Sequence, residues 1–478
     1  MVGKFVSSGS GSARASRSMK ISSPPTPSRV SKSRTVVGNA AFEICDCCAL
    51  MKAIDPCRFP YFLKRVALLM MLACILPAMV ARAENSMYRV SENGRYLVDN
   101  KGSPFFWQGD SEWELLYALS AQDAKELLHT RRVQGFTVVQ AMCDGMFPKW
   151  IAPDRLPPSR ELMPWTDNNP LTPNEVFFTR MDAIVAAAQE EHMLLLIGVY
   201  HVDDVTANRI TLANVGAWTR WLANRYKDAP GIIWTMYSPL DPSSFPMVRA
   251  AVSGLKQGDG GGHLVTLHPE GVAGSSSIVQ ADLSFNTFQS LASGYLNYQF
   301  AQADFARTPV KPVVNGEARY EADGGTTPFD VRRSAWWSYL AGAGFSYGHI
   351  NNWKSPGSWR EWVNSPGAQQ VAVAGSFLRL LAWWRLIPDQ SALIDSSRNG
   401  VAARSADGDW IVAYLPTNSP VTLKLTALSS SRTALVSWIN PLNGERMRVG
   451  RYSTSARPRL TPPANWQDGV LLAEKAPD

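Results

Sequence analysis

The chain has 478 residues, which is enough for two or three domains of ordinary size. Its formal net charge is +7, but residues 1–83 hold 12 of the 47 basic residues and 3 of the 40 acidic residues. Residues 84–478 therefore carry 35 basic and 37 acidic residues, a balance of −2. The folded part lacks the basic character of a nucleic-acid-binding protein, and we expect no nucleic-acid partner.

A secretory signal is expected near the N-terminus. The basic pair Lys64-Arg65 precedes an apolar run at 66–80, and a small-x-small cleavage pattern ends at Ala83. The run is short for a membrane span, so we expect cleavage after Ala83 and no stable membrane anchor. Residues 1–50 are too long and polar for an ordinary signal, which suggests that translation starts at Met51. The mature protein is then exported, to the periplasm or the extracellular medium.

Cysteine and histidine usage argues against disulfides and metal sites in the mature protein. Only Cys143 lies after the leader, so no internal disulfide is expected. The same part of the chain has no His-Glu-x-x-His pattern, and its histidines are scattered. We therefore expect neither a metal nor another cofactor.

Apolar strand patterns alternate with helical patterns along residues 84–383, after a small hairpin expected at 88–99. We expect strands at 104–110, 136–141, 193–199, 232–236, 264–267, 283–288, 313–314 and 344–347. We expect helices at 120–134, 174–192, 214–227, 245–256, 293–306, 329–343 and 368–383. Eight strands that alternate with helices predict an α/β domain of the (β/α)8 TIM-barrel type. The alternative, a doubly wound open sheet, is disfavoured because no Gly-rich phosphate loop follows the first strand.

A different pattern begins at residue 384 and continues to residue 478. Short, often alternating apolar segments are separated by turn residues, as in Asp409-Trp-Ile-Val-Ala-Tyr-Leu415 and Val421-Thr-Leu-Lys-Leu425. This pattern predicts a small all-β sandwich that follows the barrel. Such a domain is more often accessory than catalytic.

Polar and aromatic residues follow the expected strands, where a (β/α)8 barrel gathers its catalytic groups. They are Asp110, Trp113, Gln140, Tyr200, His201, Asp203, Asp241, His268, Gln289, Glu317, Tyr347, His349 and Trp353. Aromatic faces stack on sugar rings, amides and imidazoles bind hydroxyls, and paired acids break glycosidic bonds, so this set suits a carbohydrate substrate.

Plainer readings of several candidates stay open. Asp110 would serve equally well as a helix cap, and Glu317 as a loop carboxylate paired with Arg319. His268 and His349 would fit a hydrogen-bonded interior, and Trp353 the core.

Several separated motifs resemble those of the apiosidase-like glycoside hydrolases, glycoside hydrolase family 140. They are Pro104-Phe-Phe-Trp-Gln-Gly-Asp-Ser-Glu-Trp-Glu-Leu115, Gly135-Phe-Thr-Val-Val-Gln140, Asn169-Pro170, Pro173-Asn174, Ile232-Ile-Trp234, His268-Pro269, Phe285-Asn286, Gln289-Ser290, Gly316-Glu317, Tyr320-Glu321, Tyr347-Gly-His349 and Trp353. The tail after residue 365 resembles the β domain often joined to this family and called a putative collagen-binding domain. The resemblance implies a TIM barrel with one catalytic carboxylate after strand 4 and another after strand 7, which releases apiose from pectin-derived glycans.

The two implied carboxylate positions differ in this chain. Glu317 matches the strand-7 position, whose implied role is the nucleophile. At strand 4 the family usually has Trp-Ile-Leu-Gly-Gly-Asp, whereas this chain has Trp234-Thr-Met-Tyr-Ser-Pro239. Proline cannot transfer a proton, so Asp241, two residues on, is the first replacement to consider, and Asp203 and Glu112 are weaker ones.

Three functions follow, in order of preference. The first is an exported glycoside hydrolase that cleaves a plant-type or bacterial polysaccharide with Glu317 and Asp241 as its two carboxylates. The second is a catalytically impaired relative that binds glycan, motivated by Pro239. The third is a protein-binding role centred on the β domain.

Overall fold

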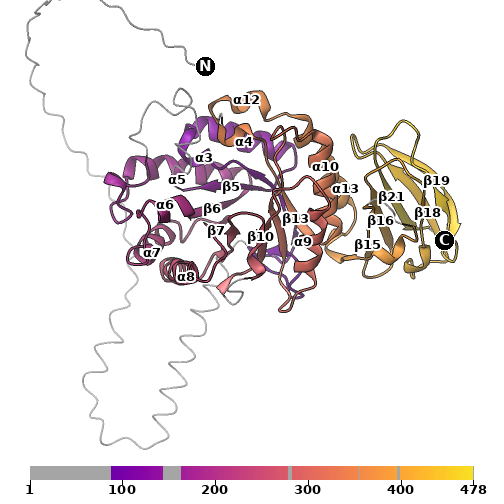
Figure 1. The fold of residues 1–478 in the computed structure, drawn as a ribbon, viewed down its shortest axis with the longest axis horizontal. Coiled ribbons are helices and arrows are strands. Elements are labelled where there is room, and N and C mark those ends of the chain that lie inside the picture. The colour runs from indigo at the N-terminus through magenta and orange to yellow at the C-terminus, as the bar shows by residue number, and fades with distance from the viewer. Residues whose placement is uncertain (1–87, 144–162, 278–281, 355, 396–398, 477–478) are drawn as a thin grey trace, which may run out of the picture. The chain divides into compact units, whose positions relative to one another are not determined.

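The computed structural model describes residues 88–143, 163–277, 282–354, 356–395 and 399–476, with Trp353 described by its backbone alone (Figure 1). The expected leader, signal and cleavage site fall within 1–87 and so lie outside the described residues. None of the helices in the described ranges is long and apolar enough to cross a membrane.

Eight positions around one parallel sheet form the first domain. Its strands are β4 (Gln108–Ser111), β5 (Val138–Met142), β6 (Leu194–His201), β7 (Ile232–Ser238), β8 (Leu264–Val265) continued by β9 (His268–Pro269), β11 (Asn286–Gln289), β12 (Val313–Glu317) and β13 (Ala343–Tyr347). The hydrogen-bonded order runs β11-β12-β13-β4-β5-β6-β7-β8, with β9 also paired to β7. The Ser284 N–H donates to the Val265 carbonyl at 2.7 Å, which joins the fifth position to the sixth and closes the ring. The expected TIM barrel is confirmed.

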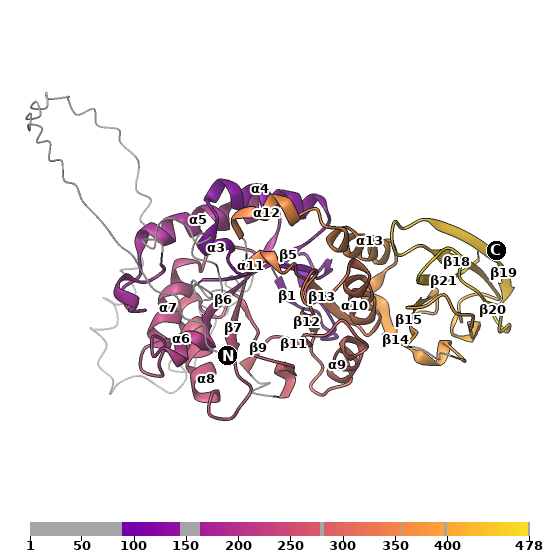
Figure 2. The ribbon, with the colours of Figure 1, turned by 45° about the horizontal axis from the view of Figure 1, so that its top comes forward.

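Helices surround these strands (Figure 2). They are α3 (Leu115–Ala118), α4 (Ala121–Val133), α5 (Glu175–Glu190), α6 (Val202–Thr206), α7 (Val215–Arg225), α8 (Phe245–Asp259), α9 (Leu296–Phe305), α10 (Pro328–Leu340), α11 (Asn351–Lys354), α12 (Trp359–Trp362) and α13 (Pro366–Leu380). Local signals fix several of their starts, as at α4, where the Asp123 N–H donates to the Ser120 hydroxyl at 3.0 Å.

A three-stranded antiparallel sheet precedes the barrel and agrees with the expected hairpin. It contains β1 (Tyr88–Val90), β2 (Leu97–Asp99) and β3 (Pro104–Phe105). The first expected strand, 104–110, is thus two strands, because Pro104–Phe105 pairs with β2 and only Gln108–Ser111 enters the barrel. One short strand, β10 (Ala273–Gly274), pairs antiparallel with β11.

The C-terminal domain is all-β, as expected. Its six-stranded antiparallel sheet has the order β14-β15-β16-β21-β18-β19, and β17 pairs with β20. The strands are β14 (Leu386–Pro388), β15 (Val401–Ser405), β16 (Trp410–Leu415), β17 (Val421–Thr422), β18 (Thr433–Ile439), β19 (Arg446–Ser453), β20 (Arg459–Leu460) and β21 (Gly469–Lys475). Buried aliphatic residues of these strands form a core of their own.

Helix α10 joins the barrel to this β domain through buried contacts. The Trp336 ring stacks on Tyr414 with centroids 5.8 Å apart. Arg332 donates from Nε and Nη2 to the two carboxylate oxygens of Asp468, at 2.9 and 2.8 Å, and both side chains are 1% exposed. The Tyr414 hydroxyl donates to the same carboxylate at 2.8 Å. A buried, hydrogen-bonded ion pair therefore lies between the two domains.

Candidate active site

The centre of the candidate site is Glu317, the last residue of β12. The segment Val313–Glu317 is wholly buried in the barrel wall, and the Glu317 side chain is 12% exposed at the carboxyl end of the strand. β12 lies between β11 and β13, and Glu317 is paired in register with Gln289 of β11. A carboxyl group at this end of a barrel strand is in the position where such folds place their chemistry.

Aromatic and imidazole rings enclose Glu317. His268, which is fully buried, has its Nε2 3.5 Å from the Glu317 Oε2. Its ring stacks on Tyr237 with centroids 4.6 Å apart and 15° between the planes. Trp113 meets His268 edge-on at 5.2 Å and donates from Nε1 to the Tyr320 hydroxyl at 2.6 Å. Strands β7, β9 and β12 and the segments that follow β4 and β12 thus contribute to one cluster.

The environment of Glu317 perturbs its protonation. Burial raises the pKa of Glu317 to about 8, and the charge of Asp323 acts in the same direction, while the hydroxyls of Tyr320 and Tyr237 partly offset the rise. Burial also lowers the pKa of His268 to about 4, so its imidazole is neutral at neutral pH. Near pH 7 the free site therefore holds a largely protonated carboxyl group beside a neutral imidazole.

Gln140 and Gln289, both predicted site residues, line the same cluster. Gln140 donates from Nε2 to the Gly316 carbonyl and to the Ser111 hydroxyl, both at 2.9 Å, which ties β5 to β12 and β4 beneath the site. Gln289 donates from Nε2 to the Tyr237 hydroxyl at 3.0 Å. Gln140 therefore supports the backbone next to Glu317, while Gln289 orients Tyr237.

Asp110 and Tyr347, two further predicted site residues, lie outside the Glu317 cluster. They are register partners on neighbouring strands, and both meet Arg131 of α4 rather than the Glu317 cluster. Arg131 donates from Nε to Asp110 at 2.5 Å, and the Tyr347 hydroxyl donates to Glu321 at 2.6 Å. Because Asp110 is 1% exposed and Tyr347 is fully buried between strand and helix, neither is placed to contact a sugar.

Glu112, a weaker candidate for the second carboxylate, belongs to this buried group around Arg131. Its Oε1 lies 3.5 Å from the Arg131 Nη2. Burial and the neighbouring Asp110 hold the pKa of Glu112 well above its usual value. With 3% exposure, its carboxyl group has no open path to the leaving group of a bound glycan.

His349 and Trp353 follow β13. The His349 ring stacks on Trp362 with centroids 5.5 Å apart, and its Nδ1 accepts the Asn351 N–H at 3.2 Å. His349 is 8% exposed and is therefore a packed, hydrogen-bonded histidine. The Trp353 backbone lies in α11, and its side chain is outside what the structure describes.

Asp241 lies in the turn before α8 and is exposed. Its Oδ1 accepts the Ser243 N–H at 2.8 Å and also the Ser243 hydroxyl, as in a turn cap. These hydrogen bonds, the hydroxyl first, hold the pKa of Asp241 below its usual value. A low pKa is the wrong direction for a general acid, which must carry a proton at working pH.

Sequence reasoning missed two residues of the cluster, Tyr237 and Tyr320. Strand β7 continues to Ser238, two residues beyond its expected end, which brings Tyr237 into the barrel. The available signal was the alternation along β7, since Tyr237 is two residues after Thr235, and Thr235 accepts the His268 N–H at 3.0 Å.

A further pattern, Gly344-Phe-Ser346-Tyr-Gly348, has the spacing of a serine-hydrolase elbow. Ser346, however, lies inside β13 rather than at a strand-to-helix turn, and it is 1% exposed. Its hydroxyl accepts from the Trp107 Nε1 at 3.2 Å and donates to the Gln140 Oε1 at 3.1 Å. Ser346 is thus a hydrogen-bonded residue of the barrel interior.

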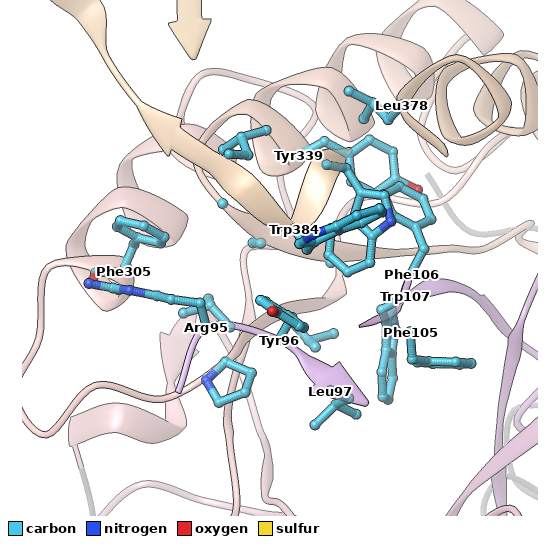
Figure 3. A pocket seen from close by; sticks show the side chains of 18 residues that line it. Arg95, Tyr96, Leu97, Phe105, Phe106, Trp107, Phe305, Tyr339, Leu378 and Trp384 are labelled. Atoms are coloured by element: carbon cyan, nitrogen blue, oxygen red, sulfur yellow. The ribbon is translucent and has the colours of Figure 1, made fainter. Parts of the chain in front are cut away.

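An apolar cavity of about 70 Å³ lies at the other end of the barrel. Its lining includes Trp107, Val313 and Gly344 near the starts of strands, together with Arg95 and Trp384 (Figure 3). The strands are parallel, so this cavity and Glu317 lie at opposite ends of them. It is therefore separate from the candidate active site.

The barrel and its carboxylate-bearing mouth define a class, the TIM-barrel fold shared by many glycoside hydrolases. Residues 91–385 match the family described as "Apiosidase-like, catalytic domain", and residues 387–474 match the "Putative collagen-binding domain of a collagenase". The first match spans more than half of the chain. This protein belongs to the apiosidase-like family.

Solved structures share the fold. One described as a glycoside hydrolase is 23% identical with a TM-score of 0.70, over 82% of this chain and 97% of that one. A glycoside hydrolase family 5 protein from Bacteroides vulgatus is 23% identical with a TM-score of 0.71, over 82% of this chain and 94% of that one. No curated protein matches the chain significantly.

Proposed function

We propose that this protein is a glycoside hydrolase in which Glu317 is the catalytic nucleophile. The observation that carries the proposal is a nearly buried carboxyl group at the end of β12, enclosed by Tyr237, Tyr320 and His268. The family match supports the same reaction class. The proposed substrate is a plant-type or bacterial polysaccharide, with apiose as the first sugar to test.

The chemistry of the cluster fits this role. An oxocarbenium-like transition state develops positive charge at the anomeric carbon, and an ionised Glu317 would stabilise that charge strongly in a site with little water. The hydroxyls of Tyr237 and Tyr320 favour the ionised form of Glu317. His268, which is neutral, adds no charge that would repel the positive charge of the transition state.

The remaining parts of the proposal concern location and the β domain. We propose that the protein acts after export, on the basis of the basic pair, apolar run and small-x-small pattern that end at Ala83. The β domain is proposed as an accessory that packs on α10 through Arg332 and Asp468.

One observation favours a second function, glycan binding without turnover. β7 ends at Ser238, so Pro239 follows directly at the carboxyl end of the fourth strand, where the family usually has an aspartate. Without any second carboxyl group at the mouth, the site would bind a sugar but not protonate its leaving oxygen.

Sugar release separates the two functions. The purified protein, Glu317→Gln and the matched control Glu445→Gln are incubated with pectic and bacterial polysaccharide oligosaccharides, and products are followed by mass. Glu445 is an exposed carboxylate in a turn of the β domain. Hydrolysis predicts release by the parent and by Glu445→Gln but not by Glu317→Gln. Binding by all three proteins with no sugar release from any substrate would favour the second function, glycan binding without turnover.

A further inference from the structure

The register between β7 and β9 places a carboxylate beside Pro239. Tyr237 pairs with His268 and Ser238 pairs with Pro269, in parallel. The Glu270 N–H then donates to the Ser238 carbonyl at 2.9 Å. Glu270 therefore stands one strand away from Pro239, at the same level of the barrel.

The residues next to Glu270 at this end of the barrel belong to the cluster around Glu317. Tyr237 and His268 stack on each other at 4.6 Å, and His268 lies next to Glu317. Pro239 and Glu270 directly follow the last residues of β7 and β9, so both lie at the carboxyl end of the barrel, two residues after Tyr237 and His268. Consistent with this position, the pKa of Tyr237 is raised first by burial, then by Glu317, and also by the charge of Glu270.

The spacing across the sheet suits a pair of carboxyl groups. Only β11 lies between the β9 position and β12, and neighbouring strands are about 4.8 Å apart, so the two backbones are roughly 10 Å apart. Glutamate side chains that extend from two such backbones can approach the separation of about 5 to 5.5 Å used by retaining glycoside hydrolases. Glu270 is exposed, unlike Glu112, so it can exchange protons with water.

Two other carboxylates at this end of the barrel, Asp241 and Asp203, are less well placed. Asp241 is held by Ser243 in its turn. Asp203 lies 3.6 Å from the His201 Nδ1, on the far side of Tyr237, against which the His201 ring packs at 4.6 Å.

We propose that Glu270 is the general acid and base of this site, in place of the strand-4 aspartate absent at Pro239. This inference rests on the proposed function. Glu317 attacks the anomeric carbon, the glycosidic C–O bond breaks with its electron pair on the leaving oxygen, and that oxygen takes the Glu270 proton. Glu270, now ionised, then removes a proton from a water molecule while the water oxygen attacks the anomeric carbon. The bond between this carbon and Glu317 breaks, which releases Glu317 as carboxylate.

Leaving-group dependence tests the assignment. Parent protein, Glu270→Gln, Asp241→Asn and Glu445→Gln are assayed on pectic oligosaccharides and on 2,4-dinitrophenyl apioside, whose leaving group needs no proton. Glu270→Gln should lose about 10²- to 10⁴-fold on the oligosaccharides and much less in release of dinitrophenolate. With Glu270→Ala, added azide should restore turnover and give glycosyl azide, because azide attacks without a base.

Three results would overturn the assignment. An active parent with Glu270→Gln unchanged on both substrates would remove Glu270 from the mechanism and leave the proposed function intact. The same signature in Asp241→Asn instead would transfer the role to Asp241. A parent that cleaves neither substrate would refute the proposed function itself, and Glu270 with it.

Discussion

Replacing Glu317 by glutamine should stabilise the protein, and the gain should depend on pH. Burial raises the pKa of Glu317 from 4.5 to about 8. Below about pH 4 the carboxyl group is protonated in both the folded and the unfolded state, so it costs no stability. Between the two pKa values the unfolded chain loses this proton while the folded protein keeps it, so the stability of the parent falls as pH rises, by about 1.4 kcal/mol per pH unit.

The size of the effect follows from this shift. The penalty reaches about 3 kcal/mol near pH 7 and levels off at about 5 kcal/mol above roughly pH 9, where both states are ionised. Glutamine has nearly the same shape and does not titrate, so the variant lacks the penalty. Sites that trade stability for function commonly behave in this way.

The assay is urea unfolding of the parent and Glu317→Gln at several pH values from 4 to 9. Glu445→Gln, altered at an exposed carboxylate of the β domain, serves as the control and should follow the parent. The two free energies of unfolding should agree near pH 4 and diverge as pH rises. Curves for parent and Glu317→Gln that stay parallel from pH 4 to 9 would refute the reasoning.

Three further predictions follow from the same contacts. The kcat/KM for release of dinitrophenolate, a leaving group that needs no proton, should rise with pH up to about 8, because Glu317 must ionise before it attacks. A profile that falls over this range would instead assign Glu317 the role of acid. Tyr320→Phe removes a hydroxyl that lowers the pKa of Glu317, so the rise of kcat/KM should move to higher pH and kcat/KM near pH 7 should drop about 10-fold. An unchanged pH profile would contradict the hydrogen bond between Tyr320 and Glu317. Asp468→Ala leaves Arg332 buried without its partner and should lower the free energy of unfolding in urea by about 3 to 5 kcal/mol. The control Asp395→Ala, which breaks an exposed pair, should lower it by less than about 1 kcal/mol. Equal losses in the two variants would contradict this account.

The barrel was predictable because its signals are local and repeated. Nearly continuous apolar strands such as Leu194–His201 alternate with capped helices such as Ala121–Val133, and only a few architectures accommodate that order. The β domain was predictable for a similar reason, from short alternating segments between turns. The position of Glu317 followed directly from the end of its strand.

The rest of the site depends on register, which a single sequence does not fix. Asp110 and Tyr347 follow the rule for mouth residues, yet their parity along the strands turns them toward Arg131. Tyr237 was hidden because β7 runs two residues beyond its expected end. Glu270 could not be selected from the sequence, because its place beside Pro239 follows from the pairing of Ser238 with Pro269 on a neighbouring strand.

The most direct test of the central claim is to trap the covalent intermediate. The parent protein is incubated with dinitrophenyl apioside in which fluorine replaces the 2-hydroxyl, which slows hydrolysis of a glycosyl-enzyme, and proteolytic peptides are then weighed. The account predicts one added glycosyl group on the peptide that contains Glu317, and none in Glu317→Gln. A glycosyl group on another carboxylate, or turnover with inversion and no adduct, would contradict it.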